Sequence, residues 1–169
     1  MLKYRVKRIE ANCPAAIRYE GLKCYHDGKY EEAFDYYSKA AELGDIAAHY
    51  HLATLYGYGK GVEKDERKQM KHAETAAIGG HPGARMFFYT LEMKKGNSNR
   101  AIKHIVIAAK QGAEHAIELL EGFYANGHGT VSREVLDEAL RGYQKALDAM
   151  KSPQREEADK AIRLGFDGF

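Results

Sequence analysis

Eight histidines are the first side chains in this 169-residue sequence that could do chemistry, because imidazole is a common ligand of transition metals. Two histidines on one helix reach the same ion when they stand at positions i and i+4. His49 and His51 stand two positions apart, which on a helix turns their side chains about 200° away from each other. No two histidines stand at i and i+4, and the chain has no Cys-x-x-Cys motif. The spacing therefore predicts structural histidines and no metal site.

A second candidate is the pair Cys24 and His26, because a thiol can act as a nucleophile and an imidazole as its base. Two positions apart on a helix they face different sides, and the sequence suggests no third group to orient the imidazole. We expect Cys24 to be a packed thiol. The segment 57–61, Gly-Tyr-Gly-Lys-Gly, superficially resembles a phosphate-binding loop, but it follows no strand and lacks the Gly-Lys-Ser/Thr ending. We predict no catalytic residue and no cofactor.

The composition is that of a folded domain with nearly balanced charge. Lys and Arg number 26 against 24 Asp and Glu, whereas domains that bind nucleic acid usually carry a clustered basic excess. The longest strongly apolar stretch, 105–109, is far shorter than the roughly 20 residues that cross a bilayer. Residues 1–8 lack the apolar run of a signal peptide, and two cysteines are few for a secreted small domain. We expect a cytoplasmic protein that binds neither nucleic acid nor membrane.

The elements that position these residues are visible as an internal repeat. A short pattern of small residues followed by glycine recurs with glycines 36 and 32 residues apart, and an alanine follows each glycine by four positions. Two anchors in phase identify a repeat, in which each glycine is expected to end a helix in the left-handed conformation. The anchors are Gly44, Gly80 and Gly112, and Ala16, Ala48, Ala84 and Ala116.

Between these anchors each unit has the pattern of two helices, the second with an apolar stripe at helical spacing. The stripe positions are Ala33, Phe34, Tyr37, Ala40 and Ala41, then Met70, Ala73, Ala76 and Ala77, then Ala101, Ile102, Ile105, Ala108 and Ala109, and in a fourth copy Ala139, Leu140, Tyr143, Ala146 and Leu147. Between the two helices of the second unit, Gly57, Gly59 and Gly61 are expected to supply the angles of a tight turn. Asp65 is expected to cap the helix that follows.

The segment 48–80 combines an Ala-x-Tyr-x-Leu-small-x-x-Tyr helix, a Gly-x-Gly-Val-x-x-Asp loop and an Ala-Ala-x-x-Gly helix end. This combination resembles the Sel-1-like repeat, a relative of the tetratricopeptide repeat (TPR), with one well-matched unit and about three degenerate ones. The resemblance implies an all-α, right-handed α–α solenoid of about four helix pairs with capping helices at both ends. It implies one domain over 1–169, with units near 13–44, 45–80, 81–112 and 113–150 and a C-terminal cap at 152–165. Leu2, Val6 and Ile9 share one helical face, which predicts the N-terminal cap.

The function that this resemblance implies is that of a non-catalytic adaptor or scaffold, which binds a protein or peptide partner in the concave groove of the solenoid. We expect a monomer or a weak homodimer. Tyr56 and Tyr124 occupy core positions of the family, and Cys24 shares their position, so we expect all three to be packed. By the family's geometry the groove residues are Arg18, Leu22 and Tyr25, Tyr50, Thr54 and Tyr58, and Met86 and Thr90.

Two alternatives stay open, a small hydrolase on the same fold and a structural subunit of a larger assembly. An enzyme is expected to show a closed pocket with strongly perturbed titrating groups. An assembly subunit is expected to expose an apolar patch on its convex face or at its ends.

Overall fold

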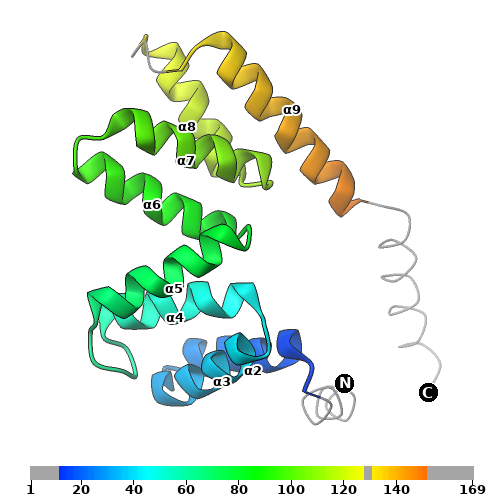
Figure 1. The fold of residues 1–169 in the computed structure, drawn as a ribbon. Coiled ribbons are helices and arrows are strands. Elements are labelled where there is room, and N and C mark those ends of the chain that lie inside the picture. Colours follow the sequence, from blue (N-terminus) through cyan, green and yellow to red (C-terminus); the bar gives the residue numbers. More distant parts are fainter. Residues whose placement is uncertain (1–11, 128–130, 152–169) are drawn as a thin grey trace, which may run out of the picture. The chain divides into compact units, whose positions relative to one another are not determined.

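The computed structural model describes residues 12–127 and 131–151, and the regular elements within these ranges are all α-helices (Figure 1). They are α2 (Pro14–His26), α3 (Tyr30–Glu42), α4 (Ile46–Tyr58), α5 (Glu66–Ile78), α6 (Pro82–Lys94), α7 (Ser98–Lys110), α8 (Glu114–Ala125) and α9 (Arg133–Met150). None of these described helices is long and apolar enough to cross a membrane. The caps predicted at 2–9 and 152–165 lie outside the described residues.

The chain forms two compact units, 1–87 and 88–169, and their boundary falls inside α6. In the first unit α2 packs against α3, α3 against α4, and α4 against α5. In the second unit α7 packs against α8 and α9, and α8 packs against α9. Most of these pairs join helices that are neighbours in the sequence, which is the contact pattern of a helical repeat.

Two clusters of small and large apolar residues form the core of the first unit. One cluster joins α3 to α4 and consists of Ala33, Tyr37, Leu52 and Leu55. The other joins α2, α3 and α4 and consists of Ile17, Ala40 and Ala48. A Cβ on Gly21 would stand 2.8 Å from the ring of Tyr37, so α2 and α3 approach each other closely at this glycine. The four anchor alanines, Ala16, Ala48, Ala84 and Ala116, are all buried.

The second unit is built around α7, whose predicted stripe is fully buried. Among the described residues of the unit, the buried hydrophobic ones are Ala101, Ile102, Ile105, Ala108 and Ala109 on α7, Ala116, Ile117 and Leu120 on α8, Val131, and Leu136 and Ala139 on α9. The fourth copy of the stripe is therefore confirmed in part. Ala139 is buried, whereas Leu140, Tyr143, Ala146 and Leu147 are half-buried.

The helix ends at Gly44, Gly80 and Gly112, which the repeat predicted, share one hydrogen-bond pattern. At the end of α3 the N–H of Gly44 donates to the carbonyl of Ala41 at 2.9 Å, and the N–H of Asp45 donates to the carbonyl of Ala40 at 3.0 Å. This Schellman motif places the glycine in the left-handed region. The ends of α5 and α7 repeat it, and the φ angles of the three glycines are 86°, 89° and 88°. The predicted role of Gly44, Gly80 and Gly112 is confirmed.

The turn between α4 and α5 departs from the prediction at one glycine. Gly59 and Gly61 have φ angles of 65° and 68°, as expected. Gly57 instead lies inside α4, and a Cβ there would stand 2.7 Å from Cδ of Gln69 on α5. The prediction for Gly57 was wrong because this glycine permits close helix packing and not a turn. Asp65 accepts a hydrogen bond from the N–H of Lys68 at 3.0 Å, which confirms the predicted cap.

Asp45 both caps α4 and holds a neighbouring helix. Its Oδ1 accepts from the N–H of Ala48 at 2.9 Å, and its two oxygens lie 3.1 and 3.0 Å from Nε of Arg18 on α2. We expect Asp45→Ala to lower the free energy of unfolding by about 2 kcal/mol, measured by urea denaturation. The change removes a cap worth about 1 kcal/mol and leaves a partly buried guanidinium without its carboxylate.

The matched control is Asp65→Ala. Asp65 caps α5 in the same way, but its ion pair with Lys68 spans 3.8 Å between exposed or half-exposed side chains. Exposed pairs contribute little, so this variant should lose only the cap, about 1 kcal/mol. Equal losses in the two variants would show that the Arg18–Asp45 pair does not stabilise the fold.

Candidate functional site

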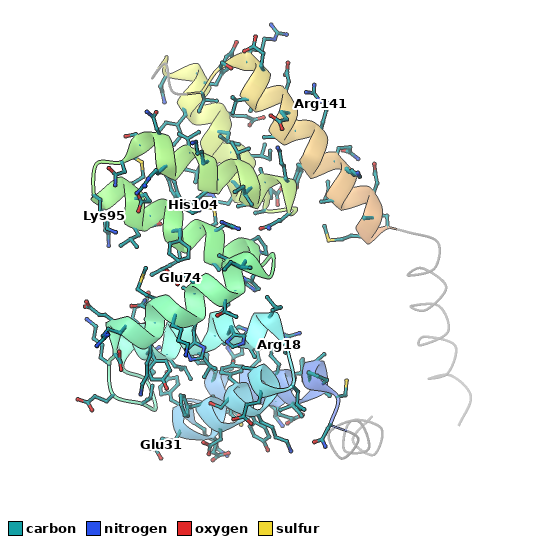
Figure 2. The ribbon with its side chains drawn as sticks, in the orientation of Figure 1. Arg18, Glu31, Glu74, Lys95, His104 and Arg141 are labelled. Atoms are coloured by element: carbon teal, nitrogen blue, oxygen red, sulfur yellow. The ribbon has the colours of Figure 1, made fainter. Side chains whose placement is uncertain are left out.

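The residues expected to line the groove of the first two units lie on α2 and α4. Arg18 reaches from α2 to the N-terminus of α4, where it is held by Asp45 (Figure 2). Leu22 is half-buried on α2. The hydroxyl of Thr54 donates to the carbonyl of Tyr50 at 3.1 Å, a bond within α4. Arg18 and Thr54 therefore already have partners inside the chain.

Tyr25 and Tyr58 are brought together by a lysine that sequence reasoning did not select. The ammonium of Lys60 lies 5.1 Å from the ring centre of Tyr25, 4.8 Å from that of Tyr30 and 6.0 Å from that of Tyr58. It also donates a hydrogen bond to the hydroxyl of Tyr25 at 3.3 Å, which raises the pKa of Lys60. We call Tyr25, Tyr30, Tyr58 and Lys60 the Tyr–Lys patch.

The patch is held in place by the turn that follows α4. Gly61 lies directly against the backbone of Tyr30, where a Cβ would overlap the carbonyl group. Val62 packs against the core cluster of α3 and α4. Tyr25 and Tyr30 meet edge to face, with ring centres 5.3 Å apart. Tyr58 is 74 % exposed, so the patch offers a large aromatic surface to solvent beside a fixed positive charge.

Tyr50, also expected in the groove, is part of a row of stacked rings. Its ring stacks on that of His81 at 4.4 Å between centres, and the ring of His51 stacks on that of Tyr37 at 4.6 Å. Burial lowers the pKa of His51 to about 4, and the nearby charge of Arg18 acts in the same direction. Burial also raises the pKa of Tyr37 to about 12. The side chains of His51 and Tyr37 are therefore neutral at pH 7 and serve packing.

The remaining two groove candidates lie on α6. Met86 is half-buried, and Thr90 is exposed. The boundary between the two units falls between Met86 and Thr90. That these two residues share one surface with α2 and α4 stays a prediction.

The two tyrosines expected in the core have different environments. Tyr56 is 7 % exposed and meets Phe34 edge to face, as predicted. Tyr124 is 43 % exposed, so its predicted packing was wrong. Tyr124 stands one residue before the end of α8, where it retains much of its solvent exposure.

Cys24 has the surroundings of a structural thiol. It packs against the cluster of α3 and α4, and its Sγ lies 3.8 Å from a carboxylate oxygen of Glu32. Burial and the charge of Glu32 raise the pKa of the thiol, which keeps it protonated at neutral pH. Neither Cys13 nor Cys24 forms a disulfide.

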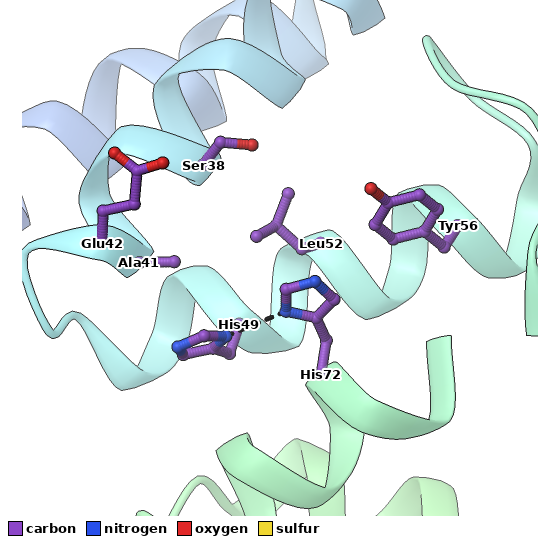
Figure 3. Close-up of a pocket in the computed structure, with 7 residues that line it drawn as sticks. All are labelled: Ser38, Ala41, Glu42, His49, Leu52, Tyr56 and His72. Atoms are coloured by element: carbon purple, nitrogen blue, oxygen red, sulfur yellow. Dashed lines mark hydrogen bonds between the residues drawn. The ribbon is translucent and has the colours of Figure 1, made fainter. Parts of the chain in front are cut away.

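A hollow of about 230 Å³ lies beside α4, open to solvent (Figure 3). Its lining comes from α3, α4 and α5, all in the first unit. The lining residues are Ser38, Ala41, Glu42, His49, Leu52, Tyr56 and His72.

Two imidazoles face each other in this hollow, although they stand 23 residues apart in the sequence (Figure 3). Nδ1 of His49 on α4 lies 2.9 Å from Nδ1 of His72 on α5, and the ring of His72 also stacks on Tyr56. Burial lowers the pKa of both histidines. Both rings are therefore neutral at pH 7, and one Nδ1–H donates to the lone pair of the other.

Sequence reasoning missed this pair because it compared histidines within one helix. The spacing within a helix shows that His49 and His51 face different sides. It carries no information on which residue of the next helix stands opposite either of them. Within residues 12–127 and 131–151, no three histidine, cysteine, aspartate or glutamate side chains gather in a metal-binding arrangement. The missed features are thus the His49–His72 pair, Tyr30 and Lys60.

The family model described as the Sel1 repeat matches residues 14–45, 46–81, 83–112 and 122–149. The chain belongs to the Sel1 repeat family. The resemblance found in the sequence is thereby confirmed, and it extends over four Sel1 repeats. The His49–His72 pair and Lys60 lie in the second of them.

Two curated relatives of this Sel1 repeat chain are named as regulators. The exopolysaccharide production negative regulator of Rhizobium meliloti (strain 1021) is 35 % identical over 72 residues, which are 42 % of this chain and 27 % of that protein. Chitin synthase regulatory factor 4 of Schizosaccharomyces pombe (strain 972 / ATCC 24843) is 36 % identical over 86 residues, 50 % of this chain and 14 % of that protein. The chain thus spans only a minor part of either relative's length.

A solved structure confirms the fold class of this Sel1 repeat chain. The crystal structure of a Sel1 repeat protein from Oxalobacter formigenes aligns with a TM-score of 0.65 and 29 % identity, covering 87 % of this chain and 63 % of that chain. The predicted all-α helical-repeat fold of the solenoid class is therefore confirmed. The predicted right-handed course stays a prediction.

Proposed function

We propose that this chain is a non-catalytic interaction module that binds a protein or peptide partner in a regulatory role. The observation that carries the proposal is the Tyr–Lys patch, where Tyr58 is 74 % exposed beside two further tyrosines and a positive charge. Tyrosine supplies a large, rigid contact area with a polar group at its tip, and it is enriched in the energetic centres of protein interfaces. The names of the two regulators support the regulatory role.

The proposed contact set keeps the residues that the family geometry selects, and it begins at the patch. Tyr25 and Tyr58 are the first residues of the set because the ammonium of Lys60 lies over the rings of both. The full set is Arg18, Leu22, Tyr25, Tyr50, Thr54, Tyr58, Met86 and Thr90.

The Sel1 repeats and the regulator names point to a non-enzymatic protein. The surroundings of Cys24 support this part of the proposal, since a protonated and packed thiol is a poor nucleophile. The hydrolase alternative is therefore not favoured. The proposal includes a cytoplasmic location, in keeping with two cysteines that form no disulfide. It also includes a monomer or weak homodimer, which light scattering measures.

Replacing Tyr58 by alanine tests the proposal. The partner is first identified by affinity purification from the native cell and mass spectrometry, and its binding to purified variants is then measured by calorimetry. We expect Tyr58→Ala to weaken binding about 10-fold or more, as truncating a central interface tyrosine does. The melting temperature should stay unchanged because the side chain is mostly exposed.

Tyr124→Ala is the matched control, because Tyr124 is also an exposed tyrosine near a helix end but lies outside the patch. It should bind the partner as tightly as the unmodified chain. Unchanged binding by Tyr58→Ala and by Tyr25→Ala would contradict the proposed function. A chain that aggregates when purified alone would instead favour the assembly subunit.

A further inference from the structure

The His49–His72 pair has three properties that packing does not require. Its two ring nitrogens point at each other at 2.9 Å, the two rings belong to different helices, and the hollow that they line is open to solvent. A hydrogen bond uses one nitrogen as donor and the other as acceptor, so only one proton lies between them. When the donor ring takes its other neutral tautomer, with the proton on Nε2 instead of Nδ1, both Nδ1 atoms carry lone pairs and become a pair of donors for a metal ion.

We propose that Nδ1 of His49 and Nδ1 of His72 form a binding site for one divalent transition-metal cation of the class that prefers imidazole, with water completing its coordination. Zn²⁺, Ni²⁺ and Cu²⁺ belong to this class, whereas Mg²⁺ and Ca²⁺ prefer oxygen ligands. The site is a two-residue site. It is therefore expected to exchange its cation with solvent, unlike the closed four-ligand sites of zinc fingers.

The distances require only a small rearrangement. Two zinc–nitrogen bonds of about 2.1 Å hold their nitrogens about 3.0 Å apart when they meet at a right angle and about 3.4 Å apart at a tetrahedral angle. The two Nδ1 atoms are already 2.9 Å apart. An N–H and a lone pair now point at each other, and in the metal-bound form two lone pairs must turn toward one common point. The open side of the hollow provides the room for this turn and for water ligands.

The surroundings favour the metal-binding form of the rings. Neutral imidazole is the form that coordinates a metal, and burial keeps both histidines neutral at pH 7 by lowering their pKa. The ring of His72 is fixed by stacking on Tyr56, with ring centres 5.7 Å apart. Glu42 lines the same hollow and adds a negative charge that attracts a cation.

The bound cation would connect the two helices of the second Sel1 repeat. His49 lies on α4 and His72 on α5, and these helices pack against each other in the first unit. A ligand that binds the folded state and not the unfolded chain stabilises the fold. We therefore expect the melting temperature of the purified chain to rise with the logarithm of the Zn²⁺ concentration and to be unaffected by Mg²⁺.

The experiment combines calorimetry with NMR on the full chain, with Zn²⁺ as the probe. We expect one Zn²⁺ per chain, and in ¹⁵N-histidine spectra the Nδ1 signals of His49 and His72 should shift while those of the other histidines stay. His49→Gln and His72→Gln should each weaken Zn²⁺ binding at least about 10-fold, because each removes one of two ligands.

The control variant is His115→Gln. His115 is an exposed histidine whose Nδ1 lies 3.0 Å from a carboxylate of Glu118, so it is the competing histidine–carboxylate pair on the surface. Its loss should leave Zn²⁺ affinity unchanged. Shifts at other histidines, or no shift at His49 and His72 at millimolar Zn²⁺, would overturn the proposal. The spectra of the unmodified chain decide this even if a glutamine variant folds poorly.

Discussion

Replacing Gly61 by alanine is expected to lower the free energy of unfolding by about 3 kcal/mol. Gly61 has a φ angle of 68°, which costs an L-residue about 1 to 2 kcal/mol. A Cβ would also overlap the backbone carbonyl of Tyr30 and stand 2.6 Å from the nitrogen of Glu31. Backbone atoms at the start of a helix cannot turn aside as a side chain can, so overpacking adds a further loss of about 1 to 3 kcal/mol. Urea denaturation followed by circular dichroism measures the change.

Gly28→Ala separates the two causes. Gly28 has a similar φ angle of 78°, but a Cβ there meets no atom within 4 Å. This variant should lose only the conformational part, about 1 kcal/mol. If Gly28→Ala and Gly61→Ala are equally destabilised, the close approach of the turn to Tyr30 is refuted. That approach also supports the Tyr–Lys patch, so Gly61→Ala should weaken partner binding together with stability.

Ile17→Ala is expected to cost about 3 kcal/mol. Ile17 is 0 % exposed and packs against Ala40 and Ala48, which are also fully buried. Alanine neighbours have no side-chain freedom with which to fill the space that the isoleucine leaves, so a cavity persists and adds to the lost burial. The loss is measured by urea denaturation followed by tyrosine fluorescence, since the chain has 12 tyrosines and no tryptophan.

Ile78→Ala makes the same chemical change in the same unit. Ile78 is 83 % exposed at the end of α5, so its truncation should change stability by less than about 0.5 kcal/mol. Similar effects of the two truncations would mean that the cluster around Ile17 does not pack as described.

Repeat periodicity made the local structure predictable. Gly44, Gly80 and Gly112 end helices as expected because a left-handed residue is needed wherever a Schellman motif closes. Asp65 caps α5 as expected because a carboxylate one position before a helix meets unpaired N–H groups. In each case the decisive interaction spans only a few residues of chain.

The incorrect predictions concern the surroundings of single side chains. Tyr124 was expected to pack like Tyr56 because the two share a position in the repeat, yet Tyr124 is exposed. Gly57 was expected to form the turn together with Gly59 and Gly61, yet it lies inside α4 against Gln69. A repeat pattern specifies the average environment of a position, whereas the neighbouring helix decides how much of that side chain is covered.

The sequence by itself determined the all-α repeat class, the helix ends and most of the alanine-lined core, because these follow from periodicity and from hydrogen bonds between near neighbours. Only the tertiary structure placed His72 opposite His49, 23 residues away, and the ammonium of Lys60 against Tyr25, 35 residues away. Both contacts depend on the register between separate helices and turns. That register is set by packing, for example by the absent side chains of Gly57 and Gly61, and not by the spacing of histidines or tyrosines along the chain.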